Sequence, residues 1–240
     1  MKRVFLKLVS SIIWIAVVFA SCSNVTAKKG NGELVTSEKA VSTFEKIAFT
    51  GGFAEVRFYA SKEYRAVVTV DSNLAEYVEV FTDKNVLNIK TKKTQSISPT
   101  KFTVDVYCPA LSGFSLSGSG SFTGVDKIVS PTFAADISGS GKVNGTFECD
   151  NFSVRVSGSG DITAAGSANN TTIAISGSGN FNGNGFETKN ASIQVSGSGD
   201  ANIGVSDNLT ANISGSGKIT YRGEAKVESN VSGSGKIKKE

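Results

Sequence analysis

Histidine is absent from this 240-residue chain, which also has only three cysteines, three prolines, one methionine and one tryptophan. Without histidine, the chain lacks the usual general base near neutral pH and the commonest metal ligand in proteins. We therefore predict no catalytic residue, metal site or cofactor. Glycine is abundant instead, with 26 residues, and only 19% of the residues are charged. This balance favours one continuous β architecture over several ordinary domains.

The first 21 residues have the features of a bacterial lipoprotein signal peptide. Lys2, Arg3 and Lys7 supply positive charge, and the apolar stretch 8–20 is shorter than the roughly 20 residues that span a bilayer. Ala20 and Ser21 precede Cys22 as in a lipobox, so Cys22 is the expected lipid-attachment site and new N-terminus. The alternative is an ordinary secreted protein with a chance cysteine. We expect residues 22–43, rich in small and polar side chains, to form a lipid-anchored flexible tether.

The charge of the mature chain is close to neutral. Removal of the signal peptide leaves 22 basic and 21 acidic residues. The mature chain therefore lacks the electrostatic footprint of a nucleic-acid-binding protein.

A Ser-Gly-Ser-Gly motif occurs seven times in the second half of the chain, at spacings of 18 to 21 residues. Its copies begin at Ser117, Ser138, Ser157, Ser176, Ser196, Ser214 and Ser232. Each copy follows the same alternating apolar pattern, which is typical of a solenoid. We predict an all-β, parallel β-helix-like solenoid over residues 111–240, with about 18–21 residues in each coil.

The pattern around the motif predicts which side chains are buried. The first, third and fifth positions before it should face inward, as in Ile137, Ala135 and Phe133, because side chains in a strand alternate. A second inward column lies two residues after the motif. The motif glycines suit a corner with positive φ, and one serine of each motif is a candidate for an inward hydroxyl ladder. Asparagines six positions before four successive motifs predict a hydrogen-bonded corner ladder with left-handed backbone: Asn151, Asn170, Asn190 and Asn208.

Residues 44–110 lack the motif but alternate strongly between polar and apolar positions. We expect five or six strands here, with a helical turn at 73–77, forming an irregular β cap at the N-terminal end or a set of irregular first coils. Both organisations remain open. We expect Cys108 and Cys149 to stay unpaired, because direct stacking of their coils would leave them two coils apart, about 9.6 Å, beyond disulfide reach.

Three segments, followed by the repeated motif, carry a resemblance to a known family. They are Phe49-Thr50-Gly51-Gly52-Phe53-Ala54-Glu55-Val56, Val70-Asp71-Ser72-Asn73-Leu74 and Cys108-Pro109-Ala110-Leu111. Over roughly residues 44–235 the chain resembles the putative auto-transporter adhesin family with a head GIN domain. The resemblance implies a right-handed β-helix-like fold with three faces per coil, a location in the cell envelope at the outer membrane of a Gram-negative bacterium, and no catalytic residues.

The outward positions of the solenoid give the candidate binding residues. Arg155, Gln194 and Asn212 each lie two positions before a motif, on a face of small polar side chains. This face is either an ordinary solvated wall or a surface that binds a glycan or another surface polymer. The membrane, through the lipid anchor, is the other expected partner, and a homo-oligomer is compatible with the sequence.

A polysaccharide-active enzyme, lyase or hydrolase, is the alternative function. Asp161 and Asp200 each follow a motif directly and should lie two coils, or about 9.6 Å, apart, near the upper separation for an inverting glycosidase. Asn180 stands between them, and no cluster of arginines is nearby. We therefore favour a non-enzymatic binding or structural module.

Overall fold

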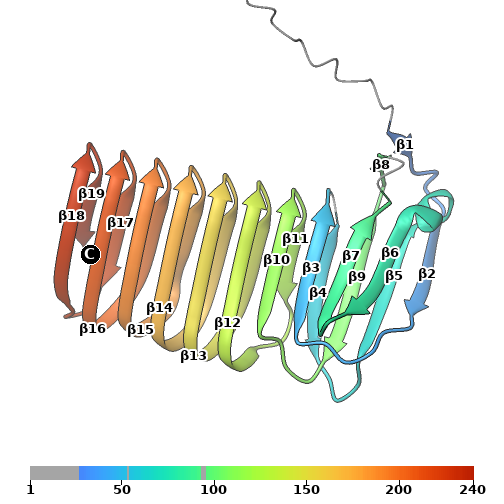
Figure 1. Cartoon of the computed structure of the whole chain (residues 1–240), viewed down its shortest axis with the longest axis horizontal. Helices are drawn as coiled ribbons and strands as arrows, with labels where there is room; N and C mark the ends of the chain where they lie inside the picture. Colours follow the sequence, from blue (N-terminus) through green and yellow to red (C-terminus); the bar gives the residue numbers. More distant parts are fainter. Residues whose placement is uncertain (1–26, 53, 93–95) are drawn as a thin grey trace, which may run out of the picture.

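The computed structural model describes residues 27–240 apart from residue 53 and residues 93–95, so the signal peptide and Cys22 lie outside the described residues. The chain forms an all-β rod of stacked coils, closed by a cap on the N-terminal side (Figure 1). The predicted helical turn is confirmed as the 3-10 helix η1 (Ser72–Tyr77). Within the described ranges, no helix is long and apolar enough to cross a membrane.

The strands fall into two groups along the chain, before and after the start of the motif region. Those before the first motif are β1 (Lys28–Lys29), β2 (Leu34–Lys39), β3 (Lys46–Gly51), β4 (Glu55–Ala60), β5 (Arg65–Asp71), β6 (Val78–Asp83), β7 (Val86–Thr91), β8 (Ile97–Ser98) and β9 (Phe102–Cys108). Those of the motif region are β10 (Gly113–Gly118), β11 (Ser121–Gly124), β12 (Ile128–Gly139), β13 (Lys142–Gly158), β14 (Asp161–Gly177), β15 (Asn180–Gly197), β16 (Asp200–Gly215), β17 (Lys218–Arg222), β18 (Lys226–Gly233) and β19 (Lys236–Lys239).

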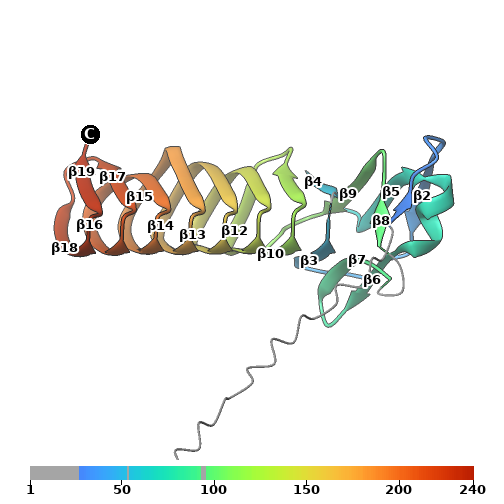
Figure 2. The same ribbon diagram turned by 90° about the horizontal axis from the view of Figure 1, so that it is seen from above.

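Each full coil of the solenoid consists of three consecutive segments, which we call its faces, and the coils stack side by side along the rod (Figure 2). The first face is the segment leading into the motif, the second face follows the motif, and the third face connects the second face to the first face of the next coil. Strands β13 to β16 run through all three faces and pair in parallel with the coil before and the coil after. All seven motifs stack in register, with Ser157 opposite Ser138 and Ser176. The predicted parallel solenoid is therefore confirmed.

The core consists of the predicted inward columns. Ile137, Ala135 and Phe133 are all at most 2% exposed, and the column that follows the motif is equally buried from Phe122 to Ile219. Phe152 lies at the centre of an aromatic cluster and contacts four other rings, with centroid distances between 4.9 and 6.3 Å. Its partners are Phe133, Phe147, Phe181 and Phe186.

The predicted asparagine ladder is present. The side-chain amide of Asn170 donates to Asn151 at 3.2 Å, that of Asn190 donates to Asn170 at 3.2 Å, and that of Asn208 donates to Asn190 at 2.8 Å. The predicted left-handed backbone is wrong, because in the described part of the chain only Lys84 and Asn85 have positive φ among residues other than glycine. The asparagines lie in extended strands, so the ladder fixes the register without an unusual backbone.

The motif serines face outward, so the predicted inward hydroxyl ladder is wrong. In the central coil, Ser157 and Ser159 are both exposed, whereas Gly160 is buried. The physical reason is lack of room, since a Cβ on Gly160 would lie 2.6 Å from the side chain of Ile137 in the preceding coil. Apolar side chains from that coil fill the corner, and the hydroxyls are left on the surface.

The segment 44–110 contains both a coil and a cap. Strand β3 pairs in parallel with β10 and places Thr50 opposite Ser117, while β4 pairs in parallel with β11. These two strands therefore form a further solenoid coil, although it has no Ser-Gly-Ser-Gly. Beyond them, β7 and β9 pair in parallel with β3 and β4, and the antiparallel pairs β6–β7, β5–β9 and β2–β5 close this end of the rod.

Part of the segment expected as a flexible tether is ordered. Residues Leu34–Lys39 form strand β2, which pairs antiparallel with β5. Its side chains are exposed on both faces or only partly buried, so the strand has no apolar alternation that sequence patterns could reveal. The preceding residues are held by Asp71, whose carboxylate accepts hydrogen bonds from the backbone N–H of Gly32 at 2.8 Å and of Thr100 at 2.8 Å. A hydrogen bond from the Thr100 hydroxyl, together with these two backbone hydrogen bonds, lowers the pKa of Asp71.

Candidate functional site

A groove of about 510 Å³ runs along the first face of the solenoid. Thr50 and the first serine of five motifs form one side, from Ser117 to Ser196; the other side consists of Ser115, Asp136, Arg155, Ala174 and Gln194. We call it the serine groove. Its two sides are two residues apart in each strand, and side chains of that spacing project from the same face. The inward residues between them, such as Ile137 and Val156, are only 2% exposed, so little of their side chains reaches the groove.

The structure brings two of the three predicted binding residues into this groove. Arg155 lies near its centre, with its side chain 73% exposed and its guanidinium 3.8 Å from the carboxylate of Asp136. Gln194 lies close to one end. Asn212 pairs in register with Gln194 in the next coil but is not among the residues that line the groove.

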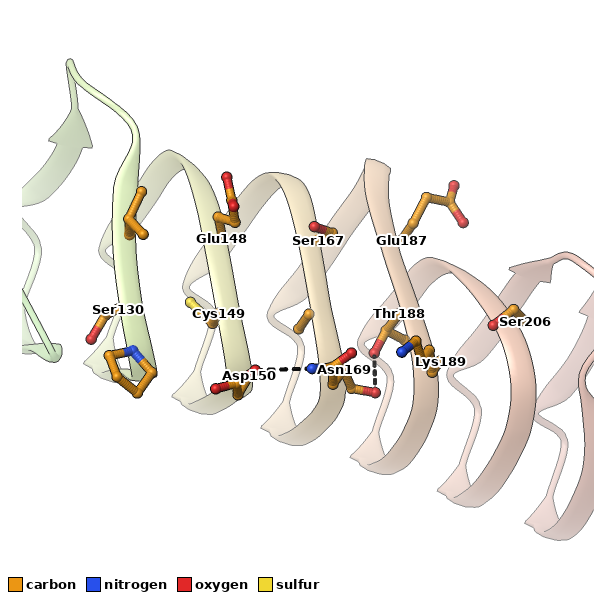
Figure 3. Close-up of a pocket in the computed structure, with 13 residues that line it drawn as sticks. Ser130, Glu148, Cys149, Asp150, Ser167, Asn169, Glu187, Thr188, Lys189 and Ser206 are labelled. Carbon is orange, nitrogen blue, oxygen red and sulfur yellow. Dashed lines mark hydrogen bonds between the residues drawn. The ribbon is translucent and has the colours of Figure 1, made fainter.

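A second groove, of about 630 Å³, lies on the third face and was missed by the sequence analysis. Figure 3 shows its two rows of side chains, one with Glu148, Ser167 and Glu187, the other with Asp150, Asn169 and Lys189. We call it the third-face groove. Asn169 donates to Asp150 at 2.9 Å along the second row. Both glutamates of the first row form ion pairs. Glu148 pairs with Lys127 at 2.7 Å, and Glu187 pairs with Arg222 at 3.2 Å.

Small residues form the floor of the third-face groove. The column that runs through Ser130, Cys149, Ala168 and Thr188 is partly or fully buried. Its hydroxyls are satisfied inside the protein, since Ser130 donates to the carbonyl of Thr132 and Thr188 bonds to Thr171. The signal in the sequence is a run of small side chains eight residues before successive motifs, where other inward positions carry larger ones.

The two cysteines among the described residues, Cys108 and Cys149, are free, as predicted, but the register behind that prediction is wrong. Cys108 lies opposite Ala60 on the second face, whereas Cys149 lies opposite Ser130 and Ala168 on the third face. The two thiols are therefore on different faces of the rod. Burial raises the pKa of Cys108 to about 12 and, together with the neighbouring Asp150 and Glu148, raises that of Cys149 to about 11.

We predict that both thiols react with a maleimide after denaturation without reductant. In the native protein at pH 8, Cys149 should be alkylated about 100-fold more slowly than an unperturbed cysteine, because a pKa near 11 leaves little thiolate. A time course of iodoacetamide labelling followed by mass spectrometry measures this rate. Labelling of native Cys149 as fast as free cysteine would contradict the described environment.

The two aspartates of the enzyme alternative are held in a ladder of hydrogen bonds on the second face. The amide of Asn180 donates to Asp161 at 2.9 Å, Asn180 accepts from the backbone N–H of Asp200 at 3.1 Å, and Asp200 accepts from the backbone N–H of Lys218 at 2.9 Å. The carboxylates therefore link neighbouring coils. Within the described ranges, no group of three or more histidine, cysteine, aspartate or glutamate side chains could hold a metal ion.

Comparison with known proteins places the chain among solenoids of the same fold. A putative adhesin from Bacteroides fragilis superposes with a TM-score of 0.83 at 21% identity, covering 88% of this chain and 99% of that chain. A putative adhesin from Parabacteroides merdae gives a TM-score of 0.71 at 26% identity, with coverage of 88% and 98%. A putative lipid binding protein from Parabacteroides distasonis gives 0.73 at 25% identity, with the same coverage.

At the level of sequence, no curated protein matches the chain. One family profile, described as "Putative auto-transporter adhesin, head GIN domain", matches residues 43–225. This match spans the β3–β4 coil, the cap strands from β5 onward and most of the motif coils. Because it covers well over half of the sequence, the chain belongs to this head GIN domain family.

Proposed function

We propose that the protein is a non-enzymatic binding module of the cell envelope, anchored through Cys22, that recognises a glycan or another extended surface polymer along the serine groove. The single observation that carries this proposal is the repetition of the groove lining. Hydroxyl groups recur once per coil, about 4.8 Å apart, over five motifs. A polymer with repeating polar groups can make the same contact in each coil, so weak individual contacts add up.

The printed name of the P. distasonis neighbour suggests lipid as a second ligand class. In this chain, the apolar residues of the serine groove point into the core, since Leu116, Ile137, Val156 and Ile175 are each 2% exposed. The lining of the groove nevertheless exposes more apolar than polar surface, and this surface comes from its outward side chains and its backbone. The regular repetition of the serine hydroxyls is what favours a hydroxyl-rich polymer, and lipid is the second ligand class to be tested.

The test is an array of glycans, matrix proteins and lipids, probed with the mature chain carrying Cys22→Ser. We expect binding to one or more extended polymers without a change in their length. Shortening of the bound polymer would favour the polysaccharide-active enzyme instead. Binding confined to lipids would overturn the polymer proposal.

We predict that replacing Arg155, Gln194 and Asn212 together by Glu weakens binding to the selected polymer at least tenfold. Two of these side chains line the serine groove and the third extends the same outward column, so negative charge would replace neutral and positive contacts. The matched control is Asn144, Thr163 and Asn182 replaced by Glu, three exposed positions that align on the second face. Surface plasmon resonance measures affinity, and circular dichroism checks that both variants remain folded. Equal binding by both triple variants would show that the first face is only a solvated wall.

We predict that Cys22→Ala abolishes incorporation of a radiolabelled fatty acid. Cys22 is the only cysteine that follows an apolar stretch and small residues at the lipobox distance. Cys149→Ala is the control and should keep the label. Persistent label in the Cys22→Ala variant would exclude the lipid anchor.

A further inference from the structure

The point at which the chain enters the fold is fixed at the capped end. Lys28 pairs with Ile97, its N–H donates to the carbonyl of Ser96 at 2.9 Å, and the N–H of Gly30 donates to Ser98 at 3.0 Å. Strand β1 lies at the end of the rod opposite the C-terminus (Figure 1). The entry is therefore a defined position on the surface.

Further contacts fasten the residues that follow β1. The amide of Asn73 donates to the carbonyl of Lys29 at 2.8 Å, and its oxygen accepts from the N–H of Asn31 at 3.1 Å. The carboxylate of Asp71 binds the N–H of Gly32 and both the N–H and the hydroxyl of Thr100. Because Gly30 to Gly32 are clamped between η1 and the start of β9, they cannot serve as a long flexible spacer.

The short link to Cys22 limits the distance of this end from a membrane. Only six peptide steps separate Cys22 from Lys28, and a fully extended chain advances at most about 3.5 Å per residue. A lipid on Cys22 would therefore hold β1 within about 20 Å of the bilayer surface. The open end of the rod has no such restriction.

Lysines with no carboxylate partner surround the same entry point. Lys29 lies in β1, Lys92 donates its backbone N–H to Tyr77, and Lys101 follows the clamped Thr100; all three are exposed. Among the described residues, none of the three forms an ion pair. Lys28, by contrast, is occupied, since its ammonium bonds to the Tyr77 hydroxyl at 3.2 Å and lies 3.6 Å from Glu76. Exposed lysines next to a lipid anchor attract anionic headgroups.

We propose that the capped end of the rod rests on the membrane, with Lys29, Lys92 and Lys101 in contact with anionic lipid headgroups, so that the solenoid projects away from the bilayer. The orientation rests on the proposed Cys22 anchor; the headgroup contact can be measured without it. In this arrangement the serine groove extends from the membrane-proximal coil of β3 outward.

Headgroup contact is tested with the mature chain carrying Cys22→Ser and with two kinds of vesicle, phosphatidylcholine alone and phosphatidylcholine with 30% phosphatidylglycerol. We expect sedimentation with the anionic vesicles only, and its loss in about 0.5 M salt. Lys29→Gln, Lys92→Gln and Lys101→Gln combined should lower partitioning at least tenfold. The matched control is Lys218→Gln, Lys236→Gln and Lys238→Gln at the open end, which removes the same charge and should bind like the parent. Equal loss in both triple variants, or no binding by the parent, would overturn the headgroup contact.

Orientation is tested with the lipidated chain in vesicles containing a headgroup fluorophore as energy acceptor. A donor is attached to Lys92→Cys or to Lys238→Cys in a background carrying Cys108→Ala and Cys149→Ala. We expect strong transfer from position 92 and weak transfer from position 238. Equal transfer from the two positions would contradict a projecting rod. Absence of fatty-acid label on Cys22 would instead contradict the lipid anchor. Failure of the chain to bind any polymer on the array would contradict the proposed polymer recognition but would leave both vesicle results unaffected.

Discussion

Replacing Gly139 and Gly158 together by Val is expected to abolish cooperative folding of the solenoid. Both residues have positive φ, +128° and +123°, a backbone conformation that a β-branched side chain rarely adopts. A Cβ on Gly158 would lie 2.5 Å from the carbonyl oxygen of Gly139, and a Cβ on Gly139 would clash with that of Gly118 in the same way. The strained backbone costs about 1–3 kcal/mol per site and the overlap about 1–3 kcal/mol more.

The summed free-energy cost at the two sites is comparable to the whole free energy of unfolding of an ordinary domain, about 5–15 kcal/mol. The measurement is urea unfolding followed by far-ultraviolet circular dichroism. Gly52→Val is the matched control, because Gly52 does not have positive φ and a Cβ there would meet nothing within 4 Å. The control should unfold like the parent protein. A double variant with parental stability would show that the stacked corners are not as close as described.

Phe152→Ala should cause the second largest effect, a loss of about 3–5 kcal/mol in the free energy of unfolding. Phe152 is 1% exposed and contacts Phe147 and Phe186 at 4.9 Å, as well as Phe133 and Phe181. Rings from two other coils cannot collapse into the space without moving their strands, so a cavity would remain. For a chain of this size, the loss corresponds to a fall in Tm of roughly 10 °C.

The control for this variant is Phe81→Ala in the cap. Phe81 is 38% exposed, and its ring contacts Lys90, whose ammonium lies 4.9 Å from the centroid. Its removal should cost less than about 1 kcal/mol. Similar losses for the two variants would mean that the aromatic cluster is not the centre of the core.

Sequence patterns predicted the part of the fold that repeats. The period of two identifies inward residues such as Ile137, and the constant motif spacing places Ser157 against Ser138, because parallel coils bring identical positions together. The asparagine ladder follows from the same register. These features depend on local alternation and on stacking, both of which are visible along the chain.

Other features of the fold depend on contacts between segments that the sequence repeat does not predict. The β3–β4 coil stacks directly on β10 and β11 although residues 61–112 lie between them in sequence. Strand β2 is exposed on both sides, so its sequence has no alternation of apolar residues that would predict its pairing with β5. The outward direction of the motif serines is set by side chains such as Ile137 in the preceding coil.

The candidate site was predicted in part. Alternation identified Arg155 and Gln194 as outward, and both line the serine groove. Where the groove ends depends on the shape of the surface, so the sequence could not show that Asn212 lies outside its lining. The third-face groove arises because Ser130, Cys149, Ala168 and Thr188 are small for inward positions. A search for the smallest inward column would have found it.

The most direct test of polymer binding along the serine groove is a length series. Size-fractionated oligomers of the polymer selected by the array are titrated into the mature chain carrying Cys22→Ser by isothermal calorimetry. We expect affinity to rise with oligomer length until the oligomer spans the groove from Ser117 to Ser196, about 19 Å, and then to level off. If an oligomer of only one or two monomer units already bound with the maximal affinity, that result would contradict recognition by stacked coils and indicate a single compact site.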